Sequence, residues 1–210
     1  GNLIQPNAQP GDIRFKDLNH DGNLDANDKT YIGNPYPDLM VGLNLGFAYK
    51  NIDFAANFYG TIGNDIFNTT KGYYSGVNGQ NVWAGTLNKA WDGEGTSYDI
   101  PRLSYNDLNL NYQRVSSFYV EDGSYFRCKN LQIGYSFNKK LLQKFHIESF
   151  RIYAGVQNLF TITKYPLYDP EVSSNVLFDR GVDGFWQAQE SPHEATMNSR
   201  VYNLGVNLTF

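Results

Sequence analysis

The sequence predicts an all-β fold, formed by the C-terminal strands and long extracellular loops of a transmembrane antiparallel β-barrel. Segments of about ten residues alternate between apolar and polar side chains, which is the length and pattern of a strand that crosses a bilayer at a tilt. The connections alternate between short and long, as they do in outer-membrane barrels. The 210-residue chain also contains 16 Tyr and 14 Phe, residues that favour strands.

The first part of the chain predicts one short strand and one hairpin. Residues 1–11 are polar and contain Pro, which indicates a loop, and Ile13 to Lys16 predicts a short strand. Strict alternation over 39–49 and 51–59, with a tight turn between them, predicts a hairpin with arms of about ten residues. Its apolar face carries Leu39, Val41, Leu43, Leu45, Phe47 and Tyr49 from the first arm, and Ile52, Phe54, Ala56 and Phe58 from the second.

Three further strands are expected over 124–137, 150–157 and 201–210, because apolar and polar residues alternate there too. In the first of them, Phe126 and Cys128 fall on the opposite face from the apolar residues that follow. A β-bulge, or a strand that extends beyond the apolar zone, would account for this change of face.

The long connections near 17–38, 60–123 and 161–199 are expected to be extracellular loops. If the chain ends in the periplasm, the alternating strand directions put all three on the cell exterior. About six strands within 1–210 are fewer than the eight of the smallest outer-membrane barrels, and an open edge in lipid leaves backbone groups unsatisfied. We therefore expect this C-terminal segment to be part of a larger barrel, with the plug domain absent from the sequence.

The stretch DLNHDGNLDAND, residues 17–28, has the pattern of a calcium-binding loop. Oxygen-bearing side chains stand at loop positions one, three, five, nine and twelve, with Gly22 at the tight-turn position and Leu24 at the apolar position eight. A hard cation takes about six to eight oxygen ligands, and Asn23 would add its backbone carbonyl. The expected ligands of a structural Ca²⁺ are Asp17, Asn19, Asp21, Asn23, Asp25 and Asp28.

The alternative for this loop is a turn cluster without metal, held by hydrogen bonds from the backbone to Asp and Asn side chains. No amphipathic helix flanks the loop, so a calcium sensor that opens a groove is not expected. A structural clip on a long loop is the better interpretation.

Charge and hydropathy exclude several classes of function. The formal net charge is −4 and no run of Lys or Arg occurs, which argues against nucleic-acid binding. No apolar run approaches the roughly twenty residues of a spanning helix, and the first residues do not resemble a signal peptide. The single cysteine, Cys128, cannot form an internal disulfide and is expected to be a small apolar strand residue.

No group of side chains has the pattern of a catalytic site, so the chain is not expected to be an enzyme. The histidines lie in the metal loop, a turn and a polar loop, and none has the spacing of the HExxH zinc motif. Two acidic pairs are adjacent in loops, which does not supply the separation that glycoside hydrolysis requires. These groups are His20, His146, His193, Asp92 with Glu94, and Glu121 with Asp122.

The chain ends with a polar residue, a glycine and two apolar residues in the order Asn203-x-Gly205-x-x-Leu208-x-Phe210. This ending resembles the C-terminal signal of bacterial outer-membrane proteins, whose last residue is usually Phe. The resemblance implies that the barrel-assembly machinery reads these four residues.

Aromatic side chains in the loop over 60–123 are candidates for contact with a substrate or a lid protein. Such rings stack on sugar faces or pack in protein interfaces, and packing within the loop is the plainer alternative. The candidates are Tyr73, Tyr74, Trp83 and Trp91.

Four stretches together resemble one known family. They are GDIRFKDLNHDGNLDANDKTYIGNPYPD (11–38), VEDGSYFRCKNLQIGYSF (120–137), VQNLFTITKYPLYDPEV (156–172) and YNLGVNLTF (202–210). They are similar to stretches of the SusC/RagA group of TonB-dependent outer-membrane transporters of Bacteroidetes, and only 185–199 departs. The resemblance implies import of a large nutrient, an oligosaccharide or oligopeptide, through the outer membrane of a Gram-negative bacterium. It also implies three partners: a SusD-like surface lipoprotein as lid, the TonB complex, and the remainder of the barrel with its plug.

The alternative of a different class is a secreted, calcium-stabilised β-sandwich that binds carbohydrate, since a soluble sandwich shows the same alternation. A sandwich predicts that the apolar faces are internal. The transporter predicts that they face lipid, at positions that include Leu43, Phe47, Phe54, Val156 and Leu204.

Overall fold

The computed structural model describes residues 3–97, 99–167, 169–172, 181–183 and 198–210. The chain forms two compact units. One unit consists of Pro35–Asp65, Asp122–Ser173 and Thr196–Phe210, and the other of Gly1–Asn34, Ile66–Glu121 and Ser174–Ala195. Within the described residues, no helix has both the length and the apolar character needed to span a membrane.

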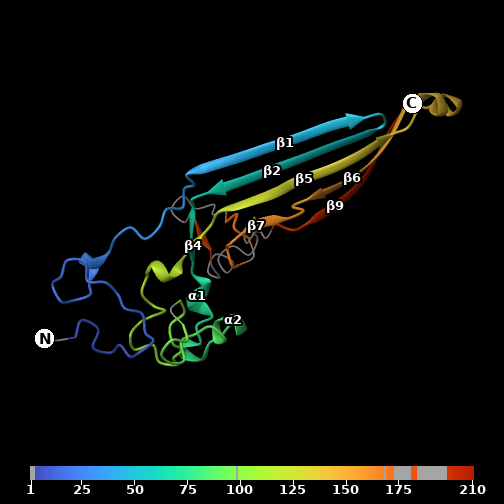
Figure 1. Ribbon diagram of the computed structural model, residues 1–210. Coiled ribbons are helices and arrows are strands. Elements are labelled where there is room, and N and C mark those ends of the chain that lie inside the picture. The colour runs from blue at the N-terminus through green and yellow to red at the C-terminus, as the bar shows by residue number, and fades with distance from the viewer. Residues whose placement is uncertain (1–2, 98, 168, 173–180, 184–197) are drawn as a thin grey trace. The chain divides into compact units, whose positions relative to one another are not determined.

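The first unit contains a large sheet whose strands follow the order of the chain. Five long strands, β1, β2, β5, β6 and β9, form neighbouring antiparallel pairs, and the short strand β7 pairs with the beginning of β5 (Figure 1). The antiparallel all-β prediction and its five long strands are therefore confirmed. The strands are β1 (Leu39–Tyr49), β2 (Ile52–Ile62), β5 (Tyr125–Ser136), β6 (Ser149–Gln157), β7 (Thr161–Thr163) and β9 (Val201–Thr209).

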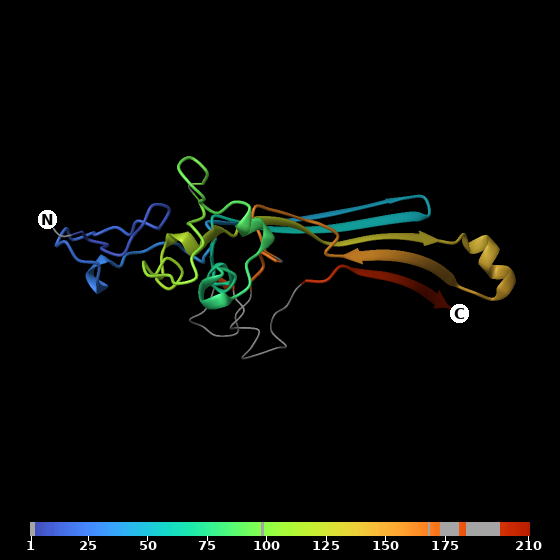
Figure 2. The same ribbon diagram turned by 90° about the horizontal axis from the view of Figure 1, so that it is seen from below.

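Two short connections lie at the same end of this sheet. Lys50, with a φ of 54°, and Asn51 form the tight turn between β1 and β2. The connection from β5 to β6 contains α3 (Lys139–Leu142) and the 3-10 helix η4 (Gln143–Phe145), and it lies near the C-terminal end of β9 (Figure 2). Because neighbouring strands are antiparallel, the two long connections leave from the opposite end, which confirms the predicted alternation of short and long connections.

The strand register collects the apolar residues on one face of the sheet. One row crosses all five long strands through the successive partners Phe47, Phe54, Ile133, Ala154 and Leu204. The rings of Phe47 and Phe54 stack with their centroids 5.0 Å apart. A slip of one residue in any strand would move its apolar residues to the other face, so this pattern fixes the register.

The apolar face is exposed. Leu43, Phe47 and Leu204 have exposed fractions of 43%, 59% and 89%, while Phe54 and Val156 are half-buried by their neighbours. A β-sandwich would bury such a face against a second sheet. The exposure is what the lipid-facing alternative predicts.

A β-bulge on β5 brings its first half into line with this pattern, and it is the correct one of the two explanations expected from the sequence. Asn57 pairs with Asn130, but the next residue of β2, Phe58, pairs with Cys128, so Lys129 is the extra residue. Phe126 and Cys128 thereby join the apolar face, where Cys128 is fully buried.

Short elements occupy the long connection over 60–123, and one more, β8, lies in the connection that follows β7. Strands β3, β4 and β8 form a small sheet in the order β4-β3-β8, in which β3 and β8 are parallel. Buried side chains nearby in sequence include Ile66, Tyr112 and Tyr119, and the Tyr119 hydroxyl donates to the carbonyl of Tyr112 at 2.6 Å. The elements are β3 (Asp65–Asn68), α1 (Thr70–Tyr73), η2 (Val77–Gly79), α2 (Ala84–Leu87), η3 (Ser117–Tyr119), β4 (Val120–Asp122) and β8 (Val182–Asp183).

The short strand expected from Ile13 to Lys16 is not formed, and this prediction is wrong. The backbone N–H of Ile13 donates to the side chain of Asn111, and that of Phe15 donates to the side chain of Gln5, both at 2.8 Å. Side-chain amides thus take the place of a neighbouring strand.

Candidate functional site

Asp17, at the first position of the predicted calcium loop, accepts hydrogen bonds from inside the loop. Its two carboxylate oxygens accept from the backbone N–H of His20 at 2.7 Å and of Gly22 at 2.9 Å. Gly22 has a φ of 86°, a left-handed conformation that glycine adopts without strain. The tight-turn role assigned to Gly22 from the sequence is therefore confirmed.

Asp28 closes the other end of the loop. Its carboxylate accepts from the backbone N–H groups of Asp25 and Leu18, both at 2.8 Å. These two hydrogen bonds, the Asp25 one first, lower the pKa of the Asp28 carboxyl below its ordinary value. Asp25 in turn caps the 3-10 helix η1 (Ala26–Asp28) by accepting from the N–H of Asn27. The Asp28 carboxylate is therefore charged at neutral pH, and hydrogen bonds within the loop hold both Asp25 and Asp28 in place.

The middle of the loop is a chain of Asx turns. The side chain of Asn19 accepts from the N–H of Asp21 at 3.1 Å, and the carboxylate of Asp21 accepts from the N–H of Asn23 at 2.8 Å. Such turns are what the metal-free alternative predicts. Within the described residues, no group of three or more His, Cys, Asp or Glu side chains is gathered closely enough to hold a metal ion. The donor types suit a hard cation, and calcium binding stays a prediction.

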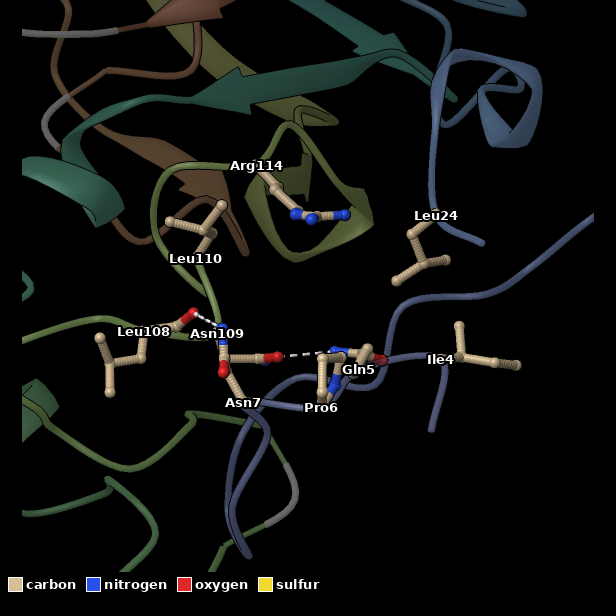
Figure 3. A pocket seen from close by; sticks show the side chains of 9 residues that line it. All are labelled: Ile4, Gln5, Pro6, Asn7, Leu24, Leu108, Asn109, Leu110 and Arg114. Carbon is tan, nitrogen blue, oxygen red and sulfur yellow. Dashed lines mark hydrogen bonds between the residues drawn. The ribbon is translucent and has the colours of Figure 1, made fainter. Parts of the chain in front are cut away.

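Leu24, the apolar residue at position eight, points toward a small pocket. Figure 3 shows Leu24 across from Ile4 and Arg114. The Arg114 guanidinium also lies over the ring of Phe15, 5.3 Å from its centroid. The loop is thus anchored beside the N-terminal segment by an apolar side chain. The pocket is lined by Ile4, Gln5, Pro6, Asn7, Leu24, Leu108, Asn109, Leu110 and Arg114.

A network of buried amides and one ion pair joins the N-terminal segment to residues 102–111. Gln5 donates to Asn109 at 2.8 Å (Figure 3), and Asn109 donates to Asn111 at 2.7 Å. Asn111 continues the network by donating to Asp12 at 2.9 Å, and Arg102 pairs with Asp12 at 2.7 Å. Side chains far apart in sequence thereby fix the chain that leads into residues 17–28.

The candidate contact aromatics pack largely on one another. Tyr73 and Tyr74 meet edge to face with centroids 5.0 Å apart, and Tyr74 stacks on Trp83 at 5.3 Å. Trp91 lies elsewhere, against Gly11, where an added Cβ would come within 2.3 Å of its ring. The structure therefore brings three of the four candidates together. All four are half-buried, as the plainer alternative of packing within the loop predicts.

The polar face of the large sheet carries a row of carboxamides that the sequence analysis did not single out. Asn44, Asn57, Asn130 and Gln157 are successive cross-strand partners on β1, β2, β5 and β6. The amide of Asn57 donates to Asn44 at 2.7 Å. Alternation marks each residue as polar-facing, but only the register shows that they form one row.

Ion pairs on this face are also not predicted by the sequence pattern. Asp53 on β2 pairs with Arg151 on β6 across the intervening strand β5. Gly134 makes room for this pair, because a Cβ there would lie 2.3 Å from Arg151 Nη2 and 2.5 Å from Asp53 Oδ1. A second group joins Arg127 and Lys129 to acidic residues after β7. No local pattern reveals such partners, since they are far apart in sequence.

The four residues of the predicted assembly signal lie in or next to β9. Asn203 and Gly205 are on the polar face, where Gly205 lies beneath the ring of Tyr153. Leu208 is on the apolar face opposite Phe150, and Phe210 is 82% exposed just beyond the strand. The structure therefore presents an exposed apolar end to this strand.

The remaining candidate groups show no catalytic arrangement among the described residues. His20 and His146 both have positive φ angles in turns, and His193 lies outside the described residues. Asp92 and Glu94 are exposed, as expected for solvated loop charges. Glu121 forms an ion pair with Lys71 at 2.6 Å.

Comparison with curated proteins finds relatives that are much longer than this chain. TonB-dependent receptor P3 of Formosa agariphila is 32% identical over 99% of this chain and 20% of its own length. TonB-dependent receptor SusC of Bacteroides thetaiotaomicron is 30% identical over 83% of this chain and 17% of its own length. The chain thus spans about a fifth of the curated relatives that it matches, and these are receptors and not enzymes. No family model matches the chain.

Solved structures give the same picture. The RagAB peptide importer in its closed-closed state superposes with a TM-score of 0.65 and 25% identity, over 96% of this chain and 20% of the other. The importer in its open-open state gives a TM-score of 0.63 and 25% identity, over 83% of this chain and 17% of the other. The sheet described above therefore has the arrangement of strands found in a segment of these proteins.

Proposed function

Because this chain belongs to the SusC-like TonB-dependent receptors, of which it spans about a fifth, we propose that it forms part of the wall of an outer-membrane nutrient importer. The observation that carries this proposal is the large sheet with its single exposed apolar face. Such a face matches lipid, whereas the opposite face, with its row of carboxamides, matches a wet interior. A sandwich module is not favoured, because it would bury the apolar face.

We propose that the cargo is a large polar nutrient, an oligosaccharide or oligopeptide. The polar face supports this class, because its carboxamides are neutral groups that both donate and accept hydrogen bonds. A SusD-like surface lipoprotein would act as lid, and TonB would act on a plug within the remainder of the barrel. The RagAB structures, which are named as a peptide importer, support an assembly of this general kind.

The test is native mass spectrometry of the detergent-extracted particle that contains this polypeptide. The importer predicts a large assembly in which the chain is accompanied by the rest of a barrel and a lipoprotein. A water-soluble particle with the 23.8 kDa mass of this chain alone would contradict the proposal and favour the sandwich module.

We also propose that the loop 17–28 binds Ca²⁺ as a structural clip on the exterior of the cell. The ion would be held by Asp17, Asn19, Asp21, Asp25 and Asp28 and by the carbonyl of Asn23. The order of the loop supports this, since Asp17 and Asp28 are already held in place by backbone N–H groups. The weak affinities of extracellular calcium sites, with Kd values of about 10⁻⁴ to 10⁻³ M, would suffice there.

Calorimetric titration of the EDTA-treated complete protein with CaCl₂ tests the clip. We expect one binding event in the wild type that Asp17→Ala abolishes and Asp92→Ala leaves intact, since Asp92 is an exposed carboxylate outside the loop. Equal heats in the wild type and in Asp17→Ala would show that residues 17–28 are a turn cluster without metal.

The candidate aromatic residues of the long loop are proposed as a contact surface. We propose that Tyr73, Tyr74 and Trp83, as one packed group, contact the lid or the cargo together. Trp91 would act separately. Their packing supports a rigid surface, because stacked rings lose little conformational entropy on binding.

A further inference from the structure

Arg127 on β5 is the centre of an ion cluster that the proposed transport function does not explain. Its side chain projects from the polar face, where its residue pairs with Tyr59, yet it is only 2% exposed. Each of its guanidinium nitrogens has an acceptor: Nη1 donates to Glu171 at 2.7 Å, Nη2 to Asp169 at 2.5 Å and Nε to the Thr161 hydroxyl at 2.7 Å. A buried guanidinium with an acceptor at each of its three nitrogens is held in one position.

The β-bulge supplies a second cation to the same cluster. Lys129, the extra residue of the bulge, reaches the carboxylate of Glu171. Glu171 is therefore shared by Arg127 and Lys129. Two positive and two negative side chains meet on the polar face of β5, and their formal charges cancel.

The same carboxylates contact the residues that precede β9. The backbone N–H of Asn198 donates to Asp169 at 3.2 Å, and its side chain donates to Glu171 at 2.9 Å. The cluster thus connects three segments: β5, the chain at 169–172, and the approach to β9.

Side chains alone hold the segment 169–172 against the sheet. In the described part of the chain, pairing between strands β7 and β5 ends at Thr163. Beyond it, the contacts that the described residues show between 169–172 and β5 are made by side chains. They are the ion pairs of Asp169 and Glu171 with Arg127 and Lys129, and a hydrogen bond between Glu171 and Tyr125. A segment fastened by a few charged contacts, and not by a strand ladder, can be released without unfolding the sheet.

We propose that Arg127, Lys129, Asp169 and Glu171 form a clasp that holds segment 169–172 over the polar face of β5 and opens as one unit. Loss of one carboxylate leaves the buried guanidinium without full compensation, so the remaining contacts weaken together. One part of this proposal rests on the proposed function: if the polar face of β5 lines the transport passage, the closed segment 169–172 narrows that passage.

Hydrogen–deuterium exchange of the complete protein in detergent tests the clasp. We expect Glu171→Gln and Lys129→Glu each to speed exchange in peptides covering 169–172 by at least about tenfold, which corresponds to 1.4 kcal/mol. Exchange in β1 and β2 should not change. Glu148→Gln, which alters an exposed carboxylate before β6, is the matched control and should exchange as the wild type does.

The double variant Lys129→Gln/Glu171→Gln distinguishes contacts that break together from independent contacts. Glu171→Gln already removes the shared partner of both cations, so exchange over 169–172 should be no faster in the double variant than in Glu171→Gln alone. Wild-type exchange in both single variants, or clearly faster exchange in the double variant than in Glu171→Gln, would overturn the proposal.

Cysteine labelling measures whether the closed clasp covers the polar face of β5. Asn130→Cys places a thiol on the polar face beside the bulge, and a membrane-impermeant maleimide added to intact cells should label it faster when Glu171→Gln is also present. If Glu171→Gln speeds hydrogen exchange over 169–172 but does not change the labelling rate, the clasp is supported and the narrowing of the passage is contradicted. Failure of the importer itself would appear separately, in the mass of the native particle.

Discussion

Gly60 on β2 lies where the neighbouring strand leaves no room for a side chain. A Cβ at Gly60 would come within 2.6 Å of the carbonyl oxygen of Tyr125 and 3.0 Å of the ring of Phe126. The carbonyl belongs to the paired strand β5 and cannot move without disturbing the ladder. A Cβ added to Gly42 on β1 would have no atom within 4 Å. The two glycines therefore differ in their surroundings and not in their strand conformation.

Gly60→Ala should therefore destabilise the protein by about 1–3 kcal/mol through overpacking. Gly42→Ala should change the free energy of unfolding by less than about 0.5 kcal/mol. Urea unfolding of the two variants in detergent measures both values. Equal stabilities would show that β2 and β5 separate easily at this point.

Asp12 is a residue whose charge stabilises the N-terminal segment. Burial raises the pKa of its carboxyl, but hydrogen bonds from Arg102, from the N–H of Gln9 and from Asn111, with the charge of Arg102, outweigh burial and lower the pKa overall. A carboxyl whose pKa is lower in the folded than in the unfolded chain stabilises the fold above its ordinary pKa of 3.8. This stabilisation is lost as the pH falls through the lowered value.

Asp12→Asn should cost about 1–3 kcal/mol at pH 7, because Arg102 loses a charged partner. The difference from the wild type should shrink as the pH falls below 3.8, because the carboxyl of the unfolded wild type is protonated there and that of the folded protein at the lowered value. Urea unfolding at pH 7 and pH 3 measures the two differences. A difference that is the same at both pH values would mean that shape, and not charge, explains the effect.

Among the elements, strand β1 carries apolar residues on one face and polar residues on the other. Leu43 is on the apolar face opposite Phe58, and its neighbour Asn44 is on the polar face opposite Asn57. On β5, the bulge at Lys129 shifts the alternation by one residue. The apolar residues before and after it therefore lie on the same face. Each of these two strands therefore presents one apolar face and one polar face.

Leu43→Arg should cost about 2–4 kcal/mol if the residue lies near the bilayer midplane. Asn44→Arg, one residue away, should be tolerated, because its side chain projects from the opposite face. Folding of both variants into lipid vesicles, followed by urea titration, measures the cost. Similar costs for the two substitutions would contradict the lipid-facing assignment.

At the scale of the whole molecule, the sheet has two open edges. In the described residues, β1 pairs only with β2 and β9 only with β6 among the long strands. An open edge in lipid leaves backbone groups without partners, so the rest of a barrel must meet both edges if the sheet lies in a membrane. The coverage of only a fifth of the relatives agrees with this requirement.

The end of β9 carries the prediction about assembly. We expect Phe210→Ser to reduce the amount of folded protein in the outer membrane at least several-fold, because the exposed terminal aromatic would no longer be available to the assembly machinery. Thr209→Ser is the matched control next to it. Immunoblotting of outer-membrane fractions compares the two, and normal levels of the Phe210 variant would count against the assembly signal.

The five long strands and their apolar faces are predictable from the sequence. The change of face before Asn130 is visible there too, with a β-bulge as one of its two explanations. The alternation of apolar and polar residues, and the position of an aromatic residue or a Cys within it, are local properties. They can be recognised without knowing which strands pair. The turn at Gly22 was also readable, because a left-handed conformation favours glycine. Ile13 to Lys16 was misread because local pattern cannot show that its N–H groups bind Gln5 and Asn111.

Which polar side chains meet depends on tertiary contacts between residues far apart in the sequence. The Asp53–Arg151 pair joins residues 98 positions apart, and the Arg127–Glu171 contact spans 44. Neither charge reveals its partner in the sequence, because many carboxylates could serve each cation equally well. Strand register and the bulge select one of them, since an ion pair or hydrogen bond forms only where the fold brings donor and acceptor within about 3 Å.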